Sequence, residues 1–174
     1  KQVLDDLRDH IYPNANTYDH RVTLFRHRNW VWSLRPIRDR CLGWLAVFQR
    51  SGHVALRSRS IFRADDRPEM AEGIAGAVWA ANRAMYVENL PLLSSSARAD
   101  VIKEYAGSTF VSEDHIKRKM PRARSYYGVP IEVRGVVWGV LVIDSVSPTL
   151  PREKIAESLP VALKYLSRTL GSVS

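Results

Sequence analysis

The stretch from residue 136 to residue 145, VVWGVLVIDS, constrains the fold more than any other part of the sequence. It is apolar at almost every position, whereas a strand with one face in water alternates apolar and polar side chains. A strand of this kind needs cover on both faces. We therefore expect it in the middle of a sheet, with other elements packed on each side of it.

Periodicity predicts the other elements. Apolar residues at helical spacing predict helices at 1–12, 69–82 and 151–170, and serine caps indicate a helix at 94–106 and a short polar helix at 112–119. Strands are predicted at 21–28, 43–50, 53–62, 84–90 and 126–134. The first and last helices each carry an apolar stripe, and such a stripe needs a partner surface. Residues 29–41, rich in Arg and Trp, are interpreted as a loop or strand extension.

Several residues predict where the helices begin, end or bend. The serines at 94–96 and Ser112 are suited to cap helix N-termini, and Gly107 is expected to end the 94–106 helix. Gly73 and Gly76 weaken their helix, and they also permit it to lie close to a sheet. Pro160 should kink the last helix or mark its true start.

The length of 174 residues suits one domain, spanning 1–174. The net charge of +8 attracts anions, or it reflects solvated arginine faces. The chain starts at Lys1 without Met and contains no membrane span or signal peptide, so we expect a cytoplasmic piece of a longer protein. An output domain or a membrane anchor is expected to lie outside this piece.

The sequence shows no catalytic or metal-binding pattern. Cys41 is the single cysteine, which excludes an internal disulfide and a cysteine-based zinc cluster, and we interpret it as a structural thiol. The five histidines show no HExxH spacing, and no P-loop is present. We therefore expect no catalytic residues, no metal and no cofactor.

Two segments resemble the GAF domain family. GIAGAVWAANRAMYVENLP (73–91) is similar to the family's helix-turn-strand segment, and SYYGVPIEVRGVVWGVLVIDS (125–145) is similar to its closing hairpin. The resemblance implies an α+β, PAS-related fold: an antiparallel sheet with the N- and C-terminal helices on one face and a ligand pocket on the other. Residues 29–41 depart from the family pattern, because they lengthen the connection between the first two strands.

The most basic segment, KRKMPRARSYY (117–127), leads in that fold from the pocket-side helices into the hairpin. Arginine binds phosphate and tyrosine stacks on bases, so the segment is a candidate anion site, although a solvated basic loop would show the same composition. The candidate ligand-binding residues are Arg57, Arg59, Trp79, Tyr86, Tyr105, Arg122, Arg124, Ser125 and Tyr127. The family's cyclic-nucleotide constellation has no match here, which leaves other anions open.

The leading hypothesis is a non-catalytic sensory and regulatory domain. It would bind a small, nucleotide-like or otherwise anionic ligand and signal through its terminal helices, which in the family often form a homodimer. The alternative is a protein-interaction or dimerisation module with an unused pocket. Nucleic-acid binding through residues 26–40 ranks third, because no recognised binding motif accompanies that basic and aromatic stretch, and an enzyme is the least expected class.

Overall fold

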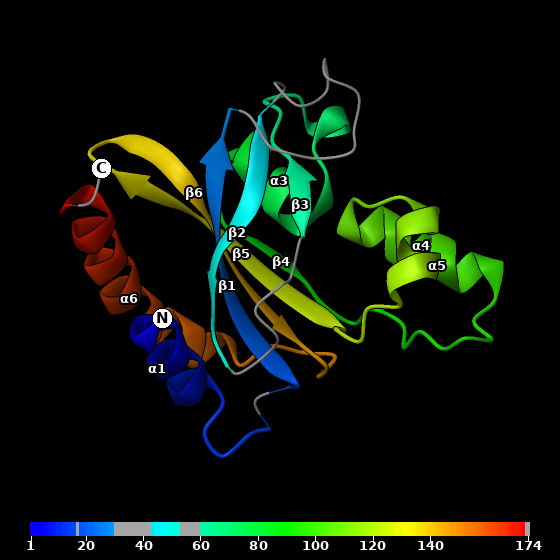
Figure 1. Ribbon diagram of the computed structural model, residues 1–174. Helices are drawn as coiled ribbons and strands as arrows, with labels where there is room; N and C mark the ends of the chain where they lie inside the picture. Colours follow the sequence, from blue (N-terminus) through cyan, green and yellow to red (C-terminus); the bar gives the residue numbers. More distant parts are fainter. Residues whose placement is uncertain (17, 30–42, 53–59, 173–174) are drawn as a thin grey trace.

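The computed structural model describes residues 1–16, 18–29, 43–52 and 60–172 (Figure 1). Its strands are β1 (His20–Arg28), β2 (Trp44–Arg50), β3 (Ile61–Arg63), β4 (Met85–Val87), β5 (Ser125–Val133) and β6 (Val136–Ser145). They form one antiparallel sheet in the order β3-β2-β1-β6-β5-β4. The apolar strand β6 lies between β1 and β5, which confirms its predicted central place.

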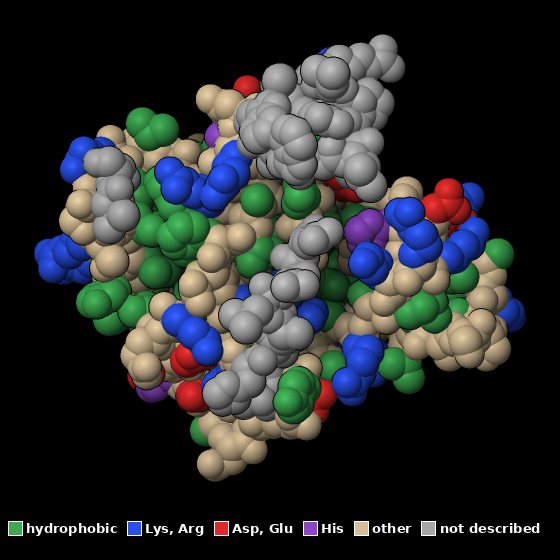
Figure 2. Space-filling view, viewed as in Figure 1, with side chains coloured by type: hydrophobic (Ala, Val, Ile, Leu, Met, Phe, Trp, Pro, Cys, Tyr) green, Lys and Arg blue, Asp and Glu red, His purple; other side chains and the backbone are tan. Residues whose placement is uncertain are grey.

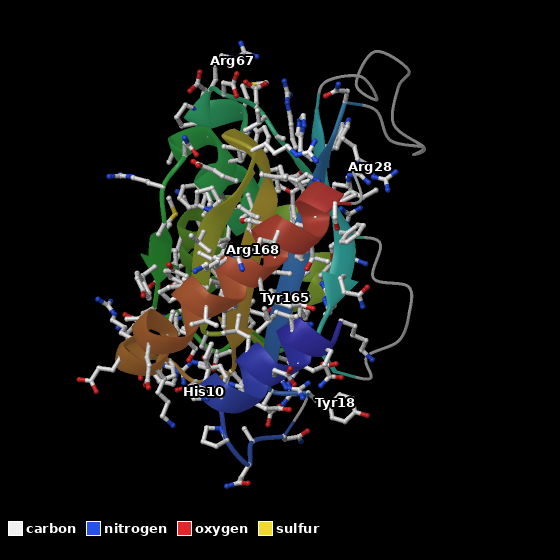
Figure 3. All side chains as sticks on the ribbon, turned by 90° about the vertical axis from the view of Figure 1, so that its left-hand side faces the viewer. His10, Tyr18, Arg28, Arg67, Tyr165 and Arg168 are labelled. Carbon is white, nitrogen blue, oxygen red and sulfur yellow. The ribbon has the colours of Figure 1, made fainter. Side chains whose placement is uncertain are left out.

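Helices cover both faces of this sheet. On one face α1 (Gln2–Ile11) packs against β1 and against α6 (Arg152–Ser172), which itself contacts β5 (Figure 3). On the other face α3 (Gly73–Ala81) packs against β5 and β6. Beyond it α4 (Ala99–Thr109) and α5 (Glu113–Lys119) pack against each other and form a lobe beside the sheet (Figure 1). The terminal helices therefore share one face.

The largest apolar cluster lies between the sheet and the terminal helices. Alternate residues of β1 and β6, such as Val22, Leu24, Leu141 and Ile143, point into it and are at most 2% exposed. The helices supply Leu4, Leu7, Ile11, Ile155, Leu159, Ala162, Leu166 and Leu170. This face holds the main core of the described structure.

The opposite face carries two smaller apolar clusters. One joins Phe25, Leu45 and Val140 of the sheet to α3, and the other lies within the α4–α5 lobe and reaches Tyr126 of β5. Close approach fixes α3 on the sheet: a Cβ at Gly128 of β5 would lie 2.5 Å from Val78 Cγ2. At Gly76 a Cβ would lie 2.6 Å from the Arg63 carbonyl oxygen, which confirms that this glycine permits close packing.

Two helices begin later than the sequence predicts. The 69–82 helix is α3 from Gly73, preceded by a short 3-10 turn at Pro68–Met70. The 94–106 helix is α4 from Ala99, and its N-cap Arg98 makes no side-chain cap hydrogen bond. Ser94 and Ser96 instead share a hydrogen bond of 3.1 Å with each other. The predicted cap at Ser112 is confirmed, since its hydroxyl accepts from the His115 amide.

The predicted helix end at Gly107 is wrong, and so is the alternative that Pro160 marks the start of the last helix, whereas a kink at Pro160 stays a prediction. Helix α4 continues through Gly107 to Thr109 because the buried side chains of Tyr105, Ala106 and Thr109 outweigh a glycine penalty of about 1 kcal/mol. Helix α6 continues through Pro160, which faces solvent while buried residues on the opposite side hold the helix to the sheet. Tertiary packing thus overrides both local signals.

The strand predictions differ from the structure mainly in length. Residues 84–90 form only the three-residue strand β4, and of the predicted strand 53–62 the part from residue 61 is seen as β3. Residues 53–59 and most of the 29–41 segment lie outside the described residues.

Candidate functional site

A cavity of about 810 Å³ lies between the sheet and the helices α3, α4 and α5. Its described lining comes from β1, β2, β3, β5, β6 and all three helices. In the space-filling view, Lys and Arg side chains gather over the α4–α5 lobe (Figure 2). The volume is within the range of about 300–1,000 Å³ that small-molecule sites occupy.

Alternation along two neighbouring strands places polar side chains in this cavity. Arg21 and Thr23 of β1 line it, whereas Val22 between them points into the main core. On β6, Asp144 lines the cavity and Ile143 belongs to the main core. Because Arg21 and Asp144 are register partners, their side chains meet on the cavity side of the sheet.

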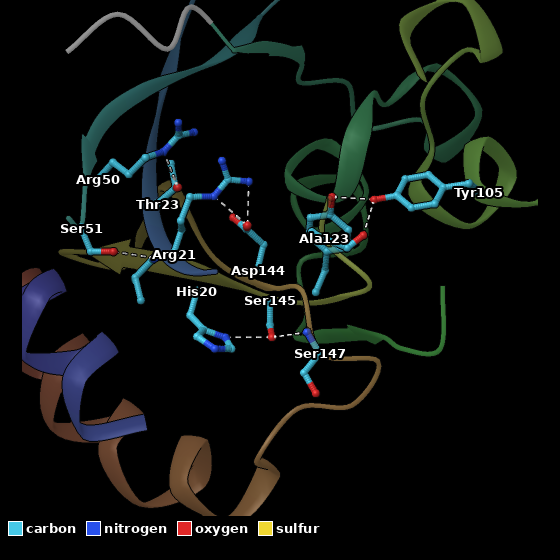
Figure 4. Close-up of polar contacts among 12 residues, drawn as sticks. His20, Arg21, Thr23, Arg50, Ser51, Tyr105, Ala123, Asp144, Ser145 and Ser147 are labelled. Carbon is cyan, nitrogen blue, oxygen red and sulfur yellow. Dashed lines mark hydrogen bonds and ion pairs between the residues drawn. The ribbon is translucent and has the colours of Figure 1, made fainter. Parts of the chain in front are cut away.

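Arg21 and Asp144 form a close ion pair. Asp144 Oδ1 accepts from Arg21 Nε at 2.8 Å and lies 2.7 Å from Arg21 Nη2 (Figure 4). The neighbouring carboxylate raises the pKa of the Arg21 guanidinium, against the opposing effect of burial. The aspartate side chain is 9% exposed, so the ion pair with Arg21 compensates its removal from water.

Arg50 of β2 brings a second guanidinium to the same place. Its Nε donates to Thr23 Oγ1 at 2.9 Å, and its side chain projects to the same side of the sheet as Arg21 (Figure 4). Burial first, and the charge of Arg21 second, lower the pKa of Arg50. Among the described side chains, no carboxylate lies within ion-pair distance of Arg50. Arg50 is therefore a cavity-lining cation whose hydrogen-bond partner, Thr23, is neutral.

Tyr105 and Tyr126 join the α4–α5 lobe to the sheet. The Tyr105 hydroxyl donates to the Ala123 carbonyl oxygen at 2.6 Å and lies 3.0 Å from the Tyr126 hydroxyl (Figure 4). Burial raises the pKa of Tyr105 to about 12 and that of Tyr126 well above its ordinary value. Both tyrosines line the cavity as neutral hydrogen-bonding groups at neutral pH.

Helix α5 supplies a further wall with a basic end. Arg118 and Lys119, in its last turn, line the cavity beside His115 and the buried Ile116. Counting the described lining, the four Arg and Lys side chains face two carboxylates, those of Asp144 and Glu72, and so carry an excess of two positive charges. The cavity thus favours anions over cations.

Of the predicted ligand-binding residues, Tyr105 lines this cavity. Trp79 lies elsewhere: it stacks on His27, with ring centroids 4.2 Å apart, and both line a second cavity of about 580 Å³. Tyr86 and Tyr127 are register partners whose rings lie on the α6 side of the sheet, where the Arg152 guanidinium lies over Tyr86. The register between β4 and β5 places the Tyr86 and Tyr127 rings away from the cavity. The local sequence does not determine this register.

The predicted basic loop also makes other contacts. Arg122 pairs with Asp19 at 3.3 Å, and Arg124 donates to the Leu90 carbonyl oxygen. Ser125 is fully buried and donates to the Ser147 carbonyl oxygen at 2.8 Å. Neither arginine nor Ser125 lines the cavity. Arg57 and Arg59 lie outside the described residues, so their role stays a prediction.

Three lining residues were not predicted from the sequence: Arg21, Arg50 and Asp144. A signal existed for two of them, since Arg21 alternates with Val22 and Asp144 interrupts an apolar strand. Arg118 and Lys119 belong to the basic segment that was singled out, but one helical turn before the residues chosen. No helix of the described structure has the length and apolar character to cross a membrane.

Comparison with known proteins gives the same fold. A GAF domain of a two-component sensor histidine kinase from Bacillus halodurans has a TM-score of 0.57 at 10% identity, covering 99% of this chain and 93% of that one. A NreA protein from Staphylococcus aureus, mutated in its nitrate binding site, has a TM-score of 0.51 at 17% identity, covering 92% and 94%.

A third similar structure is the chromophore-binding domain of the bacteriophytochrome RpBphP3 from R. palustris, with a TM-score of 0.51 at 11% identity. The match covers 98% of this chain and 55% of the bacteriophytochrome chain. No curated protein sequence matches the chain closely enough to count as a relative. The model of the GAF domain family matches residues 19–159, from the start of β1 into α6, and the chain therefore belongs to the GAF domain family.

Proposed function

We propose that this GAF domain is a non-catalytic sensory domain that binds a small anionic ligand in the cavity beside Arg21 and Arg50. Two of the cavity hydroxyls, those of Thr23 and Thr109, are engaged with Arg50 and with the Tyr105 carbonyl oxygen, and neither has a basic side chain positioned to activate it in these contacts. Similar structures come from a nitrate-binding-site mutant and from a chromophore-binding domain, which supports small-ligand binding in general.

The proposal rests on one observation, which is the environment of the Arg50 guanidinium. A cation that is largely removed from water is costly unless a counter-charge or a hydrogen-bonding group compensates it. Here Asp144 is already held by Arg21, and the Arg50 guanidinium has a neutral partner, Thr23. An anionic ligand would supply the missing charge, and a guanidinium binds carboxylate or phosphate oxygens in a bidentate manner.

Signalling would pass through the sheet to the terminal helices. Arg21 follows His20, whose Nδ1 lies 2.9 Å from Ser145 Oγ and whose ring stacks on Tyr12, the residue after α1, with centroids 3.9 Å apart. Asp144 precedes Ser145 on β6. A ligand that moves the Arg21–Asp144 pair therefore acts one residue away from the contacts that hold the end of α1. Its effect requires different affinities for the two arrangements.

Replacing Arg50 tests the proposal. Benzoate and phenyl phosphate should raise the melting temperature of the wild-type domain, whereas benzyl alcohol should not, because ligand binding stabilises the folded state in proportion to ln(1 + [L]/Kd). Arg50→Gln should weaken benzoate binding by about tenfold or more in calorimetry, which is about 1.4 kcal/mol.

Arg98→Gln is the matched control. Arg98 is 79% exposed and pairs with Asp100 far from the cavity lining, so its loss removes the same charge without removing a cavity group. Equal weakening by both variants would show a general charge effect. Full benzoate affinity in Arg50→Gln would refute the proposed site.

A homodimer through the terminal helices is the second candidate function. Val161 and Tyr165, one turn apart on the outer side of α6, are 73% and 56% exposed (Figure 3). We expect the wild-type domain to sediment as a dimer and Val161→Asp with Tyr165→Asp as a monomer, because charges there would be buried without partners. A monomeric wild type at the highest accessible concentration would argue against this function.

A further inference from the structure

We propose that the ligand carries two anionic groups, one at each end of an apolar body. Arg21 and Arg50 on the sheet would hold one group, and Arg118 and Lys119 on α5 would hold the other. This inference rests on the proposed function and names the ligand class more narrowly.

The sheet end of the cavity is a defined acceptor for one anionic group. Two guanidinium groups approach each other closely enough for Arg21 to depress the pKa of Arg50, and one carboxylate, that of Asp144, stands against them. Arg50 Nε is already held by Thr23 Oγ1, which orients the rest of the guanidinium toward the cavity. A single carboxylate or phosphate group from a ligand would balance this end.

The α5 end is a second and separate basic group. Lys117, Arg118 and Lys119 are consecutive, but Lys117 pairs with Glu113 at 3.6 Å and is not part of the cavity lining. Arg118 and Lys119 line the cavity with exposed side chains, and none of the carboxylates in the described structure forms an ion pair with them. Basic residues in the last turn also favour the helix dipole, which explains their charge but not their direction toward the cavity.

The cavity also has an apolar wall. It is formed by Phe25, Ile61, Phe62, Ile74, Val111, Ile116 and Val142. A small inorganic anion would fill little of the roughly 810 Å³ and would leave this wall and one basic end unused. An apolar body with an anionic group at each end matches all three parts of the lining.

Such a ligand would also link two parts of the molecule. The α4–α5 lobe has its own small apolar cluster and is joined to β5 by the hydrogen bond between the Tyr105 and Tyr126 hydroxyls. A ligand held at both ends would restrain α5 against the sheet, whereas a ligand held only by Arg21 and Arg50 would not. Hydrogen exchange of α5 amides therefore reports on bridging separately from affinity.

The test uses unbranched dicarboxylates from succinate to sebacate, each compared with the monocarboxylate of equal carbon number. We expect affinity to reach a maximum at one chain length, where the dicarboxylate binds at least tenfold more tightly than its monocarboxylate. At that length the dicarboxylate should also slow exchange in α5, and the monocarboxylate should not.

Variants on α5 identify the second basic end. Arg118→Gln combined with Lys119→Gln should bring the dicarboxylate to within about twofold of the monocarboxylate, and Lys117→Gln should leave its advantage intact. Both changes are at exposed positions, and circular dichroism would confirm that the helix content is unchanged.

The outcomes separate this inference from the proposed function. Equal binding of dicarboxylates and monocarboxylates, or a full dicarboxylate advantage in the double variant, would overturn the two-ended ligand while the anion site at Arg50 stands. Failure of every carboxylate to bind, together with failure of benzoate and phenyl phosphate, would overturn both.

Discussion

The two faces of the sheet are built from the same strands, but in the described part of the chain charged side chains lie among the apolar ones, around a cavity, on only one of them. Toward α1 and α6 the strands present aliphatic residues such as Val22, Leu24 and Ile143, which join one continuous apolar cluster. Toward α3, α4 and α5 they present Arg21, Thr23 and Asp144, which line a cavity between two smaller clusters.

This difference indicates that the two faces contribute differently to stability and to the proposed ligand binding. Buried aliphatic side chains contribute roughly 1.5–3 kcal/mol each through the hydrophobic effect, so the terminal-helix face supplies most of the driving force for folding. A partly buried ion pair contributes little net stability, and replacing it with well-packed apolar residues is often neutral or favourable. The charges of the cavity face are therefore better explained by a ligand than by stability.

The largest expected effect is on the terminal-helix face. Leu141→Ala removes a fully buried side chain of β6 and should lower the free energy of unfolding by about 2–5 kcal/mol. The adjacent Val142→Ala, on the cavity side, should cost clearly less, because a smaller group is lost next to existing open space. Chemical denaturation measures the free energy of unfolding of each variant. Equal losses in the two variants would contradict the proposed difference between the faces.

A smaller effect is expected for the ion pair of the cavity face. Asp144→Asn leaves Arg21 without its counter-charge and should cost about 2–3 kcal/mol in chemical denaturation. The same variant should bind benzoate more tightly, because a negative charge beside the anion site is removed. Asp100→Asn, which breaks a pair exposed on both sides, should change neither quantity. Weaker benzoate binding in Asp144→Asn would contradict the assigned role of this face.

The smallest effect is a pH dependence shared by the two faces. Burial lowers the pKa of His20, near the terminal helices, and of His27, which stacks on Trp79 on the other side. The unfolded chain then binds protons more readily at these residues, so stability should be highest above the ordinary histidine pKa of about 6.5 and fall as the pH drops below it.

Single substitutions test which face of the sheet gives rise to this pH dependence. His20→Gln and His27→Gln should each flatten the decline in melting temperature between about pH 7 and pH 5, and the exposed His10→Gln should leave it unchanged. If neither His20→Gln nor His27→Gln changes the decline in melting temperature, other titratable groups control it.

The sequence was sufficient for the sheet and its central strand because alternation and apolar runs are local properties. The apolar run at 136–145 correctly indicated a strand covered on both faces, and the terminal helices were found from their apolar stripes. The two motifs compared with the GAF family supplied the topology, which periodicity alone does not determine.

The site was harder to predict because it depends on register between distant strands. Tyr86 and Tyr127 were chosen as aromatic residues near the basic segment, yet their pairing in β4 and β5 places them on the α6 side. Arg21 and Arg50 are distant in sequence, and the pairing of β1 with β6 and β2 places Arg21 opposite Asp144 and Arg50 opposite Thr23. Alternation assigns each residue to a face of its strand, but it does not say which face a ligand will use.

The glycine at position 128 decides how the cavity can respond to an occupant. With no side chain there, Val78 sits directly on β5, so any outward shift of α3 would open a void that nothing nearby can fill. We therefore expect that wall to resist displacement. Any adjustment to the size of an occupant falls to the opposite wall, so ligands of different length should be distinguished by how far α5 moves, while α3 keeps its place.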